Sequence, residues 1–465
     1  MNKTKIVCTI GPASSNYKTI KEMVLAGMDV ARFNMSHGSH ESHHEAIQIV
    51  KQVREELGFP VSIMIDTKGP EVRIKQFENG SIVLKKNDKF TLTTKNILGN
   101  KTCVSITYAK LPSLLKKGDR MLLNDGFIEL VVLSTTATDI LTRVVCGGEL
   151  SNNKSINIPG VDLNMAYLSE NDKKDIVFAV MEEADILAIS FVNNYNNVKD
   201  VRKYLKKIGN ENMLICSKIE SKQGVDNMDE IIDASDGVMV ARGDLGVEIN
   251  FERIPWVQKE LIKRCNNKGK FSITATQMLE SMIHANRPTR AEISDVANAI
   301  LDGTSALMLS GETSSGENPV LTVKTMQKIA NECEKTLNVE LPIFESSNIS
   351  ESIGYAAADL SMSLKSKAII CVSQTGLTAK CISRFRPQCI IIACTPRIKT
   401  YHQLAIYYGV MPVMDKEYSD IDKMLKSARY QAEVEGLVKK GDLVVQTSGS
   451  CCEQFGTNTL HVTKI

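Results

Sequence analysis

Short apolar runs alternate with longer amphipathic segments over the first two thirds of the chain. The runs are rich in Val, Ile, Met and Ala and have the length of strands, and helix-like stretches fill most of the gaps between them. The predicted strands are residues 5–10, 29–35, 61–67, 184–191, 213–219, 236–242, 271–277 and 306–310. Helices are predicted for residues 16–26, 39–57, 252–267 and 319–335. Such alternation implies parallel pairing, and eight units favour a closed (β/α)8 TIM barrel over an open sheet.

The helical period disappears between residues 75 and 160. Short alternating segments separated by Asn, Gly and Asp replace it, at residues 81–85, 89–93, 120–124, 128–133 and 140–146. This pattern predicts a small β-barrel domain of residues 75–160 inserted into a loop of the TIM barrel, which then comprises residues 1–74 and 161–340. Because it grows from the predicted catalytic face, the inserted domain can act as a lid.

Strand and helix signals resume after a linker near residues 341–349. Helices are predicted at 350–363, 376–386 and 420–435, and strands at 368–372, 390–394 and 443–447. These segments predict a separate C-terminal α/β domain of residues 346–465.

The composition is that of a soluble globular protein, with 43% hydrophobic and 24% charged residues and a net charge of +2. This balance gives no reason to expect nucleic acid or a membrane as a partner, and no apolar run approaches the roughly 20 residues that span a bilayer. A strand begins at residue 5, which leaves no room for a signal peptide. The 12 cysteines form no C-x-x-C pair, and several lie in apolar strands, so a reduced cytoplasmic location is expected.

Charged and hydroxylated clusters follow six of the predicted strands, where a TIM barrel carries its active site. They span residues 32–37, 66–73, 217–220, 241–244, 274–277 and 310–313. Lys218 and Glu220 are two positions apart on a strand and therefore project to the same face. Asp244 ends the next strand, and two carboxylates with little other ligation suit Mg²⁺. Strand-end charges that meet solvent are the alternative, but three such clusters on neighbouring strands make it weak.

Two further groups of residues at the same mouth have more than one interpretation. Arg32, Arg73 and Arg242 suit a carboxylate or phosphate, or they form internal salt bridges to Asp66, Glu71, Glu220 or Asp244. Arg32 ranks above Arg242 as a ligand contact. The oxygen donors Asn34, Ser36, Asp66 and Thr67 favour a weakly bound monovalent cation or a hydrogen-bonded scaffold, and alone they favour the scaffold.

Histidines and a hydroxyl-rich turn carry weaker signals. The cluster His37, His40, His43 and His44 is expected to be largely exposed and lacks a fourth zinc ligand, so no metal site is predicted there. Residues 373–378 join a strand to a helix, as a phosphate cradle or as an ordinary capped turn. Without a nucleophile or base nearby, a regulatory site is favoured over a catalytic one, with the candidate contacts Ser373, Gln374, Thr375, Gly376 and Thr378.

These motifs resemble those of the pyruvate kinase family, and the resemblance covers essentially the whole chain. It rests on residues 5–12, 32–38, 66–73, 217–220, 239–248, 275–281 and 308–313, of which Met239 to Glu248 is especially specific. The resemblance implies transfer of a phosphoryl group from phosphoenolpyruvate to ADP, giving pyruvate and ATP in the final step of glycolysis. It also implies a cytoplasmic homotetramer.

Individual roles follow from this resemblance. Lys218 stabilises the transferring phosphoryl group, Glu220 and Asp244 hold a divalent ion (Mg²⁺ or Mn²⁺), and Arg32 contacts the substrate phosphoryl group, with Thr276 as a further catalytic residue. The carboxylate end of the substrate meets Gly243, Asp244 and Thr276. Potassium ligands match Asn34, Ser36, Asp66 and Thr67, and nucleotide contacts match Asn34, His37, Arg73 and Lys154.

Two features of the sequence bear on cation dependence and on regulation. Position 71 is acidic (Glu71), as in the potassium-dependent members of the family that the chain resembles, in which no fixed ammonium replaces the cation. The segment 442–462, which resembles the effector loop, contains no Lys or Arg. Because a bisphosphate needs positive charge for its second phosphate, the sequence favours a sugar monophosphate or a nucleotide as effector, or no effector at all.

Two other functions compete with this interpretation. An aldolase-type barrel would use Lys218 as a Schiff-base amine, which requires a depressed pKa that neighbouring carboxylates oppose. A non-catalytic sugar-phosphate sensor would keep residues 373–378 but would have no need for Lys218, Glu220 and Asp244 together.

Overall fold

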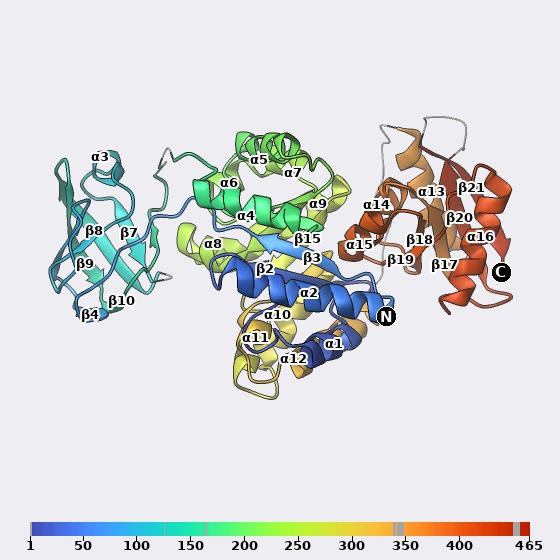
Figure 1. Cartoon of the computed structure of the whole chain (residues 1–465), viewed down its shortest axis with the longest axis horizontal. Coiled ribbons are helices and arrows are strands. Elements are labelled where there is room, and N and C mark those ends of the chain that lie inside the picture. Colours follow the sequence, from blue (N-terminus) through green and yellow to red (C-terminus); the bar gives the residue numbers. More distant parts are fainter. Residues whose placement is uncertain are drawn as a thin grey trace.

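Three bodies lie in a row along the chain's longest axis (Figure 1). The inserted domain occupies one end, the barrel the middle and the C-terminal domain the other end. The computed structural model describes residues 2–449 and 456–465, apart from 125, 162, 164, 338–340 and 342–347. The predicted linker at 341–349 therefore lies mostly outside the described residues.

Eight parallel strands close into the predicted TIM barrel in the order β1-β16-β15-β14-β13-β12-β3-β2. They are β1 (Lys5–Thr9), β2 (Val30–Asn34), β3 (Ser62–Asp66), β12 (Ile186–Ile189), β13 (Leu214–Ile219), β14 (Gly237–Ala241), β15 (Phe271–Ala275) and β16 (Ala306–Leu309). The outer helices are α1 (Tyr17–Ala26), α2 (His40–Leu57), α4 (Glu170–Met181), α5 (Tyr195–Lys207), α7 (Met228–Ala234), α9 (Ile254–Asn267), α10 (Arg290–Leu301) and α12 (Pro319–Thr336). Short helices at the strand ends include α6 (Lys222–Asp226), α8 (Arg242–Glu248) and α11 (Gly311–Ser314).

Local sequence signals explain where the barrel helices begin. Ser39, Ser169 and Thr289 each accept a hydrogen bond from the backbone N–H three residues later, and the side chain of that residue bonds back. These capping boxes satisfy N–H groups that the first turn of a helix otherwise leaves unpaired. The start of each of these helices is thereby fixed, and at Ser39 it follows directly after the strand-end cluster of residues 32–37.

The inserted domain consists of short strands, as predicted, and residues 72–75 close its larger sheet, because Arg73 bridges Ser155 beside one edge strand and Ile74 bridges Ile106 beside the other. The remaining strands pair in two groups. Among the described residues they form a six-stranded sheet, β11-β7-β8-β9-β5-β6, and a two-stranded sheet, β10-β4. The strands are β4 (Ser81–Leu84), β5 (Lys89–Thr93), β6 (Cys103–Ser105), β7 (Arg120–Leu123), β8 (Ile128–Thr135), β9 (Asp139–Cys146), β10 (Gly148–Ser151) and β11 (Ile156–Asn157), with one short helix, α3 (Leu111–Leu114). The sequence missed β6, β10 and β11, which are too short to show a clear alternation.

The C-terminal domain has a five-stranded sheet in the order β19-β18-β17-β20-β21. Its strands are β17 (Ala368–Val372), β18 (Ile390–Thr395), β19 (Val410–Met414), β20 (Leu443–Gly449) and β21 (Thr457–Lys464), and β21 alone is antiparallel to its neighbour. The helices are α13 (Ile349–Ser363), α14 (Leu377–Ser383), α15 (Ile398–Gln403) and α16 (Ile421–Val434). Neither α15, β19 nor β21 was predicted, because each is short or lacks a regular apolar period.

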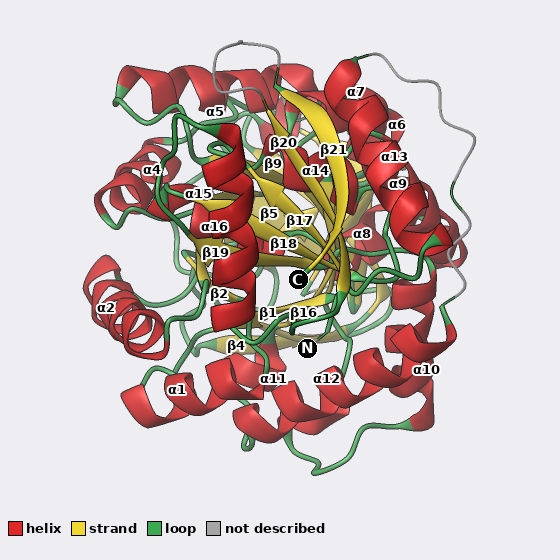
Figure 2. Ribbon diagram, turned by 90° about the vertical axis from the view of Figure 1, so that its right-hand side faces the viewer, coloured by secondary structure: helices red, strands yellow, loops and turns green. Residues whose placement is uncertain are grey.

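One apolar core runs from the barrel interior into the C-terminal domain. Met64, Met239 and Phe271 inside the barrel belong to the same buried cluster as Leu404 and Tyr407, which follow α15. The rings of Phe271 and Tyr407 meet edge to face with centroids 5.5 Å apart. The C-terminal domain therefore closes the N-terminal end of the barrel, and Figure 2 views the molecule from that side.

Polar contacts at the same interface satisfy buried groups at the starts of the strands. Lys5 Nζ donates to the carbonyl of Val410 over 2.8 Å, and Ser62 Oγ donates to the carbonyl of His402. Lys399 Nζ lies 3.3 Å from a carboxylate oxygen of the buried Asp185. The opposite end of the barrel, where the strands finish, is left for the inserted domain and the site.

Several cysteines lie in apolar strands, as the sequence predicted. Cys8, Cys216 and Cys371 are buried in strands, and burial raises the pKa of each thiol. Among the described residues no helix is long and apolar enough to cross a membrane.

Acidification is expected to weaken the contact between the C-terminal domain and the barrel through His402. Burial and the charge of Arg54 lower the pKa of His402 to about 4, from 6.5 for an exposed imidazole. The folded state therefore prefers the neutral ring, and the stability linked to it is complete above pH 6.5 and is lost as the pH falls toward 4. Between pH 7 and 5 the wild type should lose roughly 2 kcal/mol of unfolding free energy that the His402→Gln variant keeps. Urea unfolding at both pH values measures this, and equal losses in both proteins would contradict it.

Candidate active site

The predicted strand-end clusters converge on the C-terminal mouth of the barrel. Asn34 and Asp66 are paired across β2 and β3, and Asp66 is in turn level with Ala188 on β12. Ser217 on β13 is level with Ile189 on β12, and Lys218 with Met239 on β14. Residues separated by up to about 200 positions in the sequence therefore end at one height on one side of the barrel.

The carboxylate of Asp66 holds two cations from different strands. Arg32 Nε and Nη2 lie 2.7 and 2.6 Å from Asp66 Oδ2, and Lys218 Nζ lies 3.2 Å from Asp66 Oδ1. Burial of this fully enclosed carboxyl raises its pKa, but the charges of Lys218 and Arg32 outweigh burial and lower the pKa overall. Arg32 Nη1 also donates to Thr9 Oγ1 over 2.8 Å. Asp66 is thus an ionised anchor that orients both cations.

Lys218 has three oxygen partners and a small exposed surface. Besides Asp66, its ammonium lies 3.0 Å from Glu220 Oε1 and donates to Ser190 Oγ over 2.7 Å. Burial lowers the pKa of Lys218, but Asp66 and Glu220 raise it by more, so the net shift is upward. The side chain therefore carries a fixed positive charge. Ser190 was not predicted as a site residue from the sequence, because a single serine at a strand end has no distinctive spacing.

Glu220 and Asp244 form a carboxylate pair that fits a divalent cation. Glu220 is 1% exposed and accepts a 2.6 Å hydrogen bond from the backbone N–H of Phe191. Its burial, opposed by Lys218, and the nearby charge of Asp244 raise the pKa of Glu220 to about 7. Glu220 is buried and Asp244 is half-buried, and the repulsion between these like charges is relieved when a cation binds between them. Carboxylates with water and phosphate oxygens are the ligands that Mg²⁺ prefers.

The backbone at Thr276 is strained, and it places this residue beside the pair Glu220 and Asp244. Thr276 and Gln277 both have a left-handed backbone, with φ of 68° and 54°. Thr276 Oγ1 accepts from the N–H of Gly243 over 2.9 Å, which places the substrate-carboxylate residues predicted from the sequence together. Strain in two consecutive non-glycine residues requires support from the surrounding structure.

Arg242 supplies that support and is a scaffold residue in this structure. Its guanidinium donates to the carbonyls of Ala275 and Thr276 over 3.2 and 2.6 Å, and to Asp295 over 2.8 Å. The partner carboxylate, Asp295, differs from the candidates considered from the sequence. The ranking of Arg32 above Arg242 as a ligand contact remains a prediction.

The oxygen donors of the predicted potassium site lie together and already make scaffold contacts. Asn34 Oδ1 accepts from the N–H of Ser36 over 3.1 Å, and the Thr67 hydroxyl donates to the carbonyl of Ala188 over 3.5 Å. The hydrogen-bonded scaffold that the residue types favoured is therefore present. Their hard oxygens also suit a monovalent cation, which stays a prediction.

A cavity of 610 Å³ opens beside Arg32 and Asn34. It contains the predicted nucleotide residue His37, whose carbonyl bonds to a ring nitrogen of His43 over 2.7 Å. Hydroxyl groups from helices and loops also line it, contributed by Ser15, Ser42, Ser310, Ser314 and Ser315. Of these serines only Ser310 belongs to a cluster predicted from the sequence, because isolated serines are common.

The other histidines of the cluster make ion pairs between helices. His40 bonds to Asp175 over 2.7 Å, and His44 to Glu182 over 2.6 Å, both joining α2 to α4. Within the described ranges no group of three or more His, Cys, Asp or Glu could hold a metal ion.

The remaining predicted residues lie in the other two domains. Arg73 pairs with Glu71 over 2.8 Å and donates to the carbonyl of Asn153 over 2.6 Å, close to Lys154 in the sequence. In the C-terminal domain, Ser373, Gln374, Thr375 and Thr378 line a cavity of 860 Å³, and Gly376 beside them has a φ of 79°. Glu417 lies in that cavity and accepts from Gln374 over 2.6 Å. Arg397 also donates to Gln374 over 3.3 Å, so the argument against a bisphosphate rests on the absence of Lys and Arg from residues 442–462.

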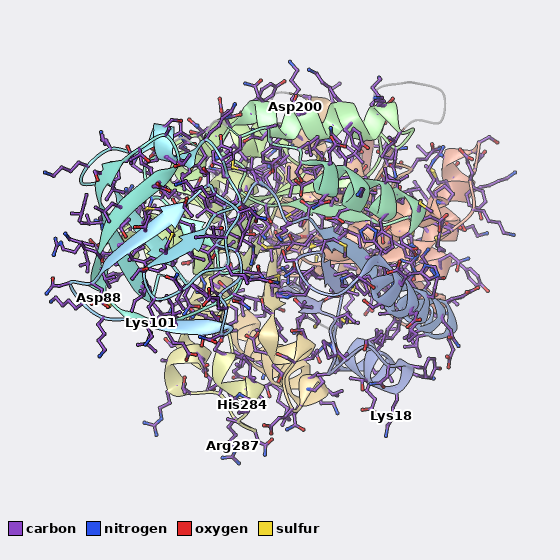
Figure 3. The ribbon with its side chains drawn as sticks, turned by 60° about the vertical axis from the view of Figure 1, so that its left-hand side comes forward. Lys18, Asp88, Lys101, Asp200, His284 and Arg287 are labelled. Carbon is purple, nitrogen blue, oxygen red and sulfur yellow. The ribbon has the colours of Figure 1, made fainter. Side chains whose placement is uncertain are left out.

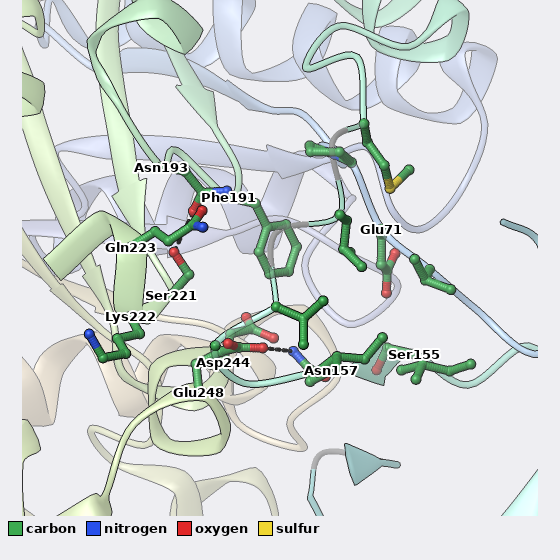
Figure 4. A pocket seen from close by; sticks show the side chains of 18 of the residues that line it. Glu71, Ser155, Asn157, Phe191, Asn193, Ser221, Lys222, Gln223, Asp244 and Glu248 are labelled. Carbon is green, nitrogen blue, oxygen red and sulfur yellow. Dashed lines mark hydrogen bonds between the residues drawn. The ribbon is translucent and has the colours of Figure 1, made fainter. Parts of the chain in front are cut away.

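A second cavity, of 280 Å³, separates the inserted domain from the barrel (Figure 4). Asp244 and Glu248 of α8 form one side of it, and Asn157 of the inserted domain faces them. Glu71 and Phe191 lie on its other walls.

Comparisons with known proteins match nearly the whole chain to one family. The family model described as "Pyruvate kinase, barrel domain" matches residues 1–323, and "Pyruvate kinase, alpha/beta domain" matches residues 351–463. A pyruvate kinase of Clostridium acetobutylicum is 42% identical over 466 residues, covering 99% of this chain and 98% of its own. One of Clostridium perfringens is 41% identical over 474 residues and all of both chains, and one of Geobacillus stearothermophilus is 43% identical over 98% of this chain and 79% of its own.

Removing the guanidinium of Arg242 is expected to destabilise the strained turn. Arg242→Met keeps the aliphatic stem but leaves the carbonyls of Ala275 and Thr276 and the carboxylate of Asp295 without this partner, at a cost of roughly 2 kcal/mol in unfolding free energy. Arg287→Met, at an exposed position labelled in Figure 3, is the matched control and should cost less than about 0.5 kcal/mol. Urea unfolding compares the two, and equal stabilities would show that Arg242 does not support the turn.

Proposed function

The chain belongs to the pyruvate kinase family, and on that premise we propose that it transfers the phosphoryl group of phosphoenolpyruvate to ADP, giving pyruvate and ATP. The observation that carries this proposal is the position of Lys218. Its ammonium lies against Asp66 and Glu220, and the charge of Asp244 reaches the same group. Phosphoryl transfer asks a protein mainly for positioning and for positive charge where negative charge spreads, and this arrangement provides both.

Charge balance explains why the proposed reaction needs a divalent ion, Mg²⁺ or Mn²⁺. With Glu220 and Asp244 ionised, the three carboxylates outnumber the cations Lys218 and Arg32 by one charge. A divalent ion held by Glu220 and Asp244 would turn this excess into a single positive charge and would attract the anionic substrate. Metal binding at these two residues and potassium binding at Asn34, Ser36, Asp66 and Thr67 are part of the proposal.

The protein's own groups would act on the transferring phosphoryl group from one side. Arg32 is held by Asp66 and Thr9 with its planar donors oriented, which suits an equatorial phosphoryl oxygen. Lys218 supplies a compact charge beside the metal carboxylates, and it acts without reorganisation because three oxygens already hold it. Thr276 and Gly243 would orient the carboxylate end of the substrate, and Arg73, Lys154, Asn34 and His37 the nucleotide.

The raised pKa of Lys218 opposes the aldolase alternative, because a Schiff-base lysine must lose its proton to attack a carbonyl. Borohydride trapping with an oxo-acid tests that alternative directly. A sugar-phosphate sensor would explain the cavity at residues 373–378 but not the charged mouth. A sugar monophosphate or nucleotide effector, a homotetramer and a cytoplasmic location stay predictions.

Pyruvate formation from phosphoenolpyruvate and ADP with Mg²⁺ tests the proposal. Fast turnover of the purified protein is expected. No turnover in K⁺ or Na⁺ buffers, with the protein folded and sugar phosphates present, would favour the sensor.

Removing the Lys218 ammonium should strip charge from the transition state while leaving the metal carboxylates in place. Lys218→Ala is expected to lower kcat by at least about 100-fold with a modest change in the KM for phosphoenolpyruvate. The control is Lys18→Ala, which removes an exposed lysine of α1 at a position labelled in Figure 3. Near-normal kcat in Lys218→Ala would refute the role.

Potassium dependence is expected from Glu71. Because no ammonium stands at position 71, a bound K⁺ must supply the missing positive charge, so turnover should be fast in K⁺ and slow in matched Na⁺ buffer. The Glu71→Lys variant should gain activity in Na⁺. Equal wild-type rates in the two buffers would contradict the cation site while leaving the proposed reaction intact.

A further inference from the structure

The inserted domain touches the barrel at one short helix, α8. Asn157 Nδ2 on β11 donates to Glu248 Oε1 at the end of α8 over 3.1 Å, and Figure 4 draws this bond. A second approach lies beside it: a Cβ atom placed on Gly126 would be 3.4 Å from a methyl carbon of Val247. Gly126 and Asn157 are 31 positions apart in the inserted domain and lie beside adjacent residues of α8, Val247 and Glu248.

The same helix carries the proposed metal ligand. Asp244 lies in the first turn of α8, and Glu248 is its last residue. Four positions correspond to roughly 6 Å along the axis and to the same helix face, so both carboxylates point toward the 280 Å³ cavity. Any shift of α8 moves the two carboxylates together.

Glu248 depends on the other domain for a hydrogen bond. Burial raises the pKa of Glu248, and the amide of Asn157 is the group that opposes this rise. Among the described residues, no other side chain donates a hydrogen bond to this carboxylate. Because the carboxylate is half-buried and its donor belongs to a second domain, the bond fixes the direction in which the two domains meet.

We propose that the Asn157–Glu248 hydrogen bond, beside which Gly126 approaches Val247, is a latch that docks the inserted domain onto α8, the helix of the proposed metal ligand Asp244. Glu248 is then a positioning residue, which acts through α8 and the inserted domain and not on the substrate. The docking itself follows from the contacts, whereas its catalytic consequence rests on the proposed function.

The latch would set where the nucleotide residues of the inserted domain lie. Lys154 is three positions before Asn157, so fixing Asn157 confines the Lys154 backbone to within about 10 Å of it. β11 is paired with β7, as Asn157 is level with Leu122, so the latch holds the six-stranded sheet and not a loose loop. Docking thereby couples the position of the inserted domain to the helix that carries Asp244.

A donor–acceptor swap tests the latch. Asn157→Asp replaces the amide donor by a carboxylate facing Glu248, which should undock the domain at pH 8. Adding Glu248→Gln to that variant restores one hydrogen bond in the opposite direction, from Gln to Asp. Asn87→Asp is the charge control; it lies next to Asp88, which Figure 3 labels at the outer end of the inserted domain.

The distance between the domains is the readout, measured by single-molecule fluorescence transfer. Dyes would be placed at Lys101 in the inserted domain and Asp200 in the barrel, both exposed, through genetically encoded azido residues. The ratio of docked to undocked molecules should fall at least about fivefold in Asn157→Asp and recover in the double variant, with no change in Asn87→Asp.

An unchanged distance distribution in Asn157→Asp, or a double variant that stays undocked, would overturn the latch. Circular dichroism and thermal unfolding show whether the inserted domain remains folded, and the double variant keeps the test valid if the single variant is unstable. If the distances respond as expected but no variant and no wild-type protein forms pyruvate, the latch stands and the proposed function fails.

Discussion

The buried carboxylate of Asp66 is the interaction on which the mouth of the barrel depends. Two cations placed side by side would repel each other by several kcal/mol in a partly buried site, and a buried lysine would otherwise tend to lose its proton. Asp66 lies on β3, between β2 with Arg32 and the β12–β13 side with Lys218, and bonds to both. One enclosed negative charge therefore orients two positive charges, holds them close together and keeps Lys218 protonated.

The rest of the architecture serves that arrangement from both ends. At the N-terminal end of the barrel, the C-terminal domain shares one apolar core with the strand interiors, so the strands that carry Asp66 and Lys218 are packed from below. At the other end, α8 carries Asp244 and also Glu248, the residue to which Asn157 of the inserted domain bonds. Strain at Thr276 and Gln277, supported by Arg242, aligns the strand ends between these two regions.

The sequence predicted the parts whose signal is local and regular. All eight barrel strands and the strand-end clusters follow from apolar runs and from charges at their ends, because buried parallel strands must be apolar while the mouth need not be. The contacts that assign roles were harder to foresee. Ser190, Thr9 and the Arg242–Asp295 pair depend on how distant strands and helices align, and no spacing in the chain encodes that. Most of the inserted strands were found, but not the segment of residues 72–75 that closes the sheet, because it pairs through single bridges and shows no alternation of its own.

The fate of the phosphorus atom tests the central claim most directly. Phosphorus NMR would follow purified protein with phosphoenolpyruvate, ADP, Mg²⁺ and K⁺. The account predicts that the phosphoenolpyruvate resonance is replaced, one for one, by the γ-phosphate resonance of ATP. Conversion to inorganic phosphate instead, or an unchanged phosphoenolpyruvate signal, would show that the charged mouth around Asp66 and Lys218 does not perform phosphoryl transfer to ADP.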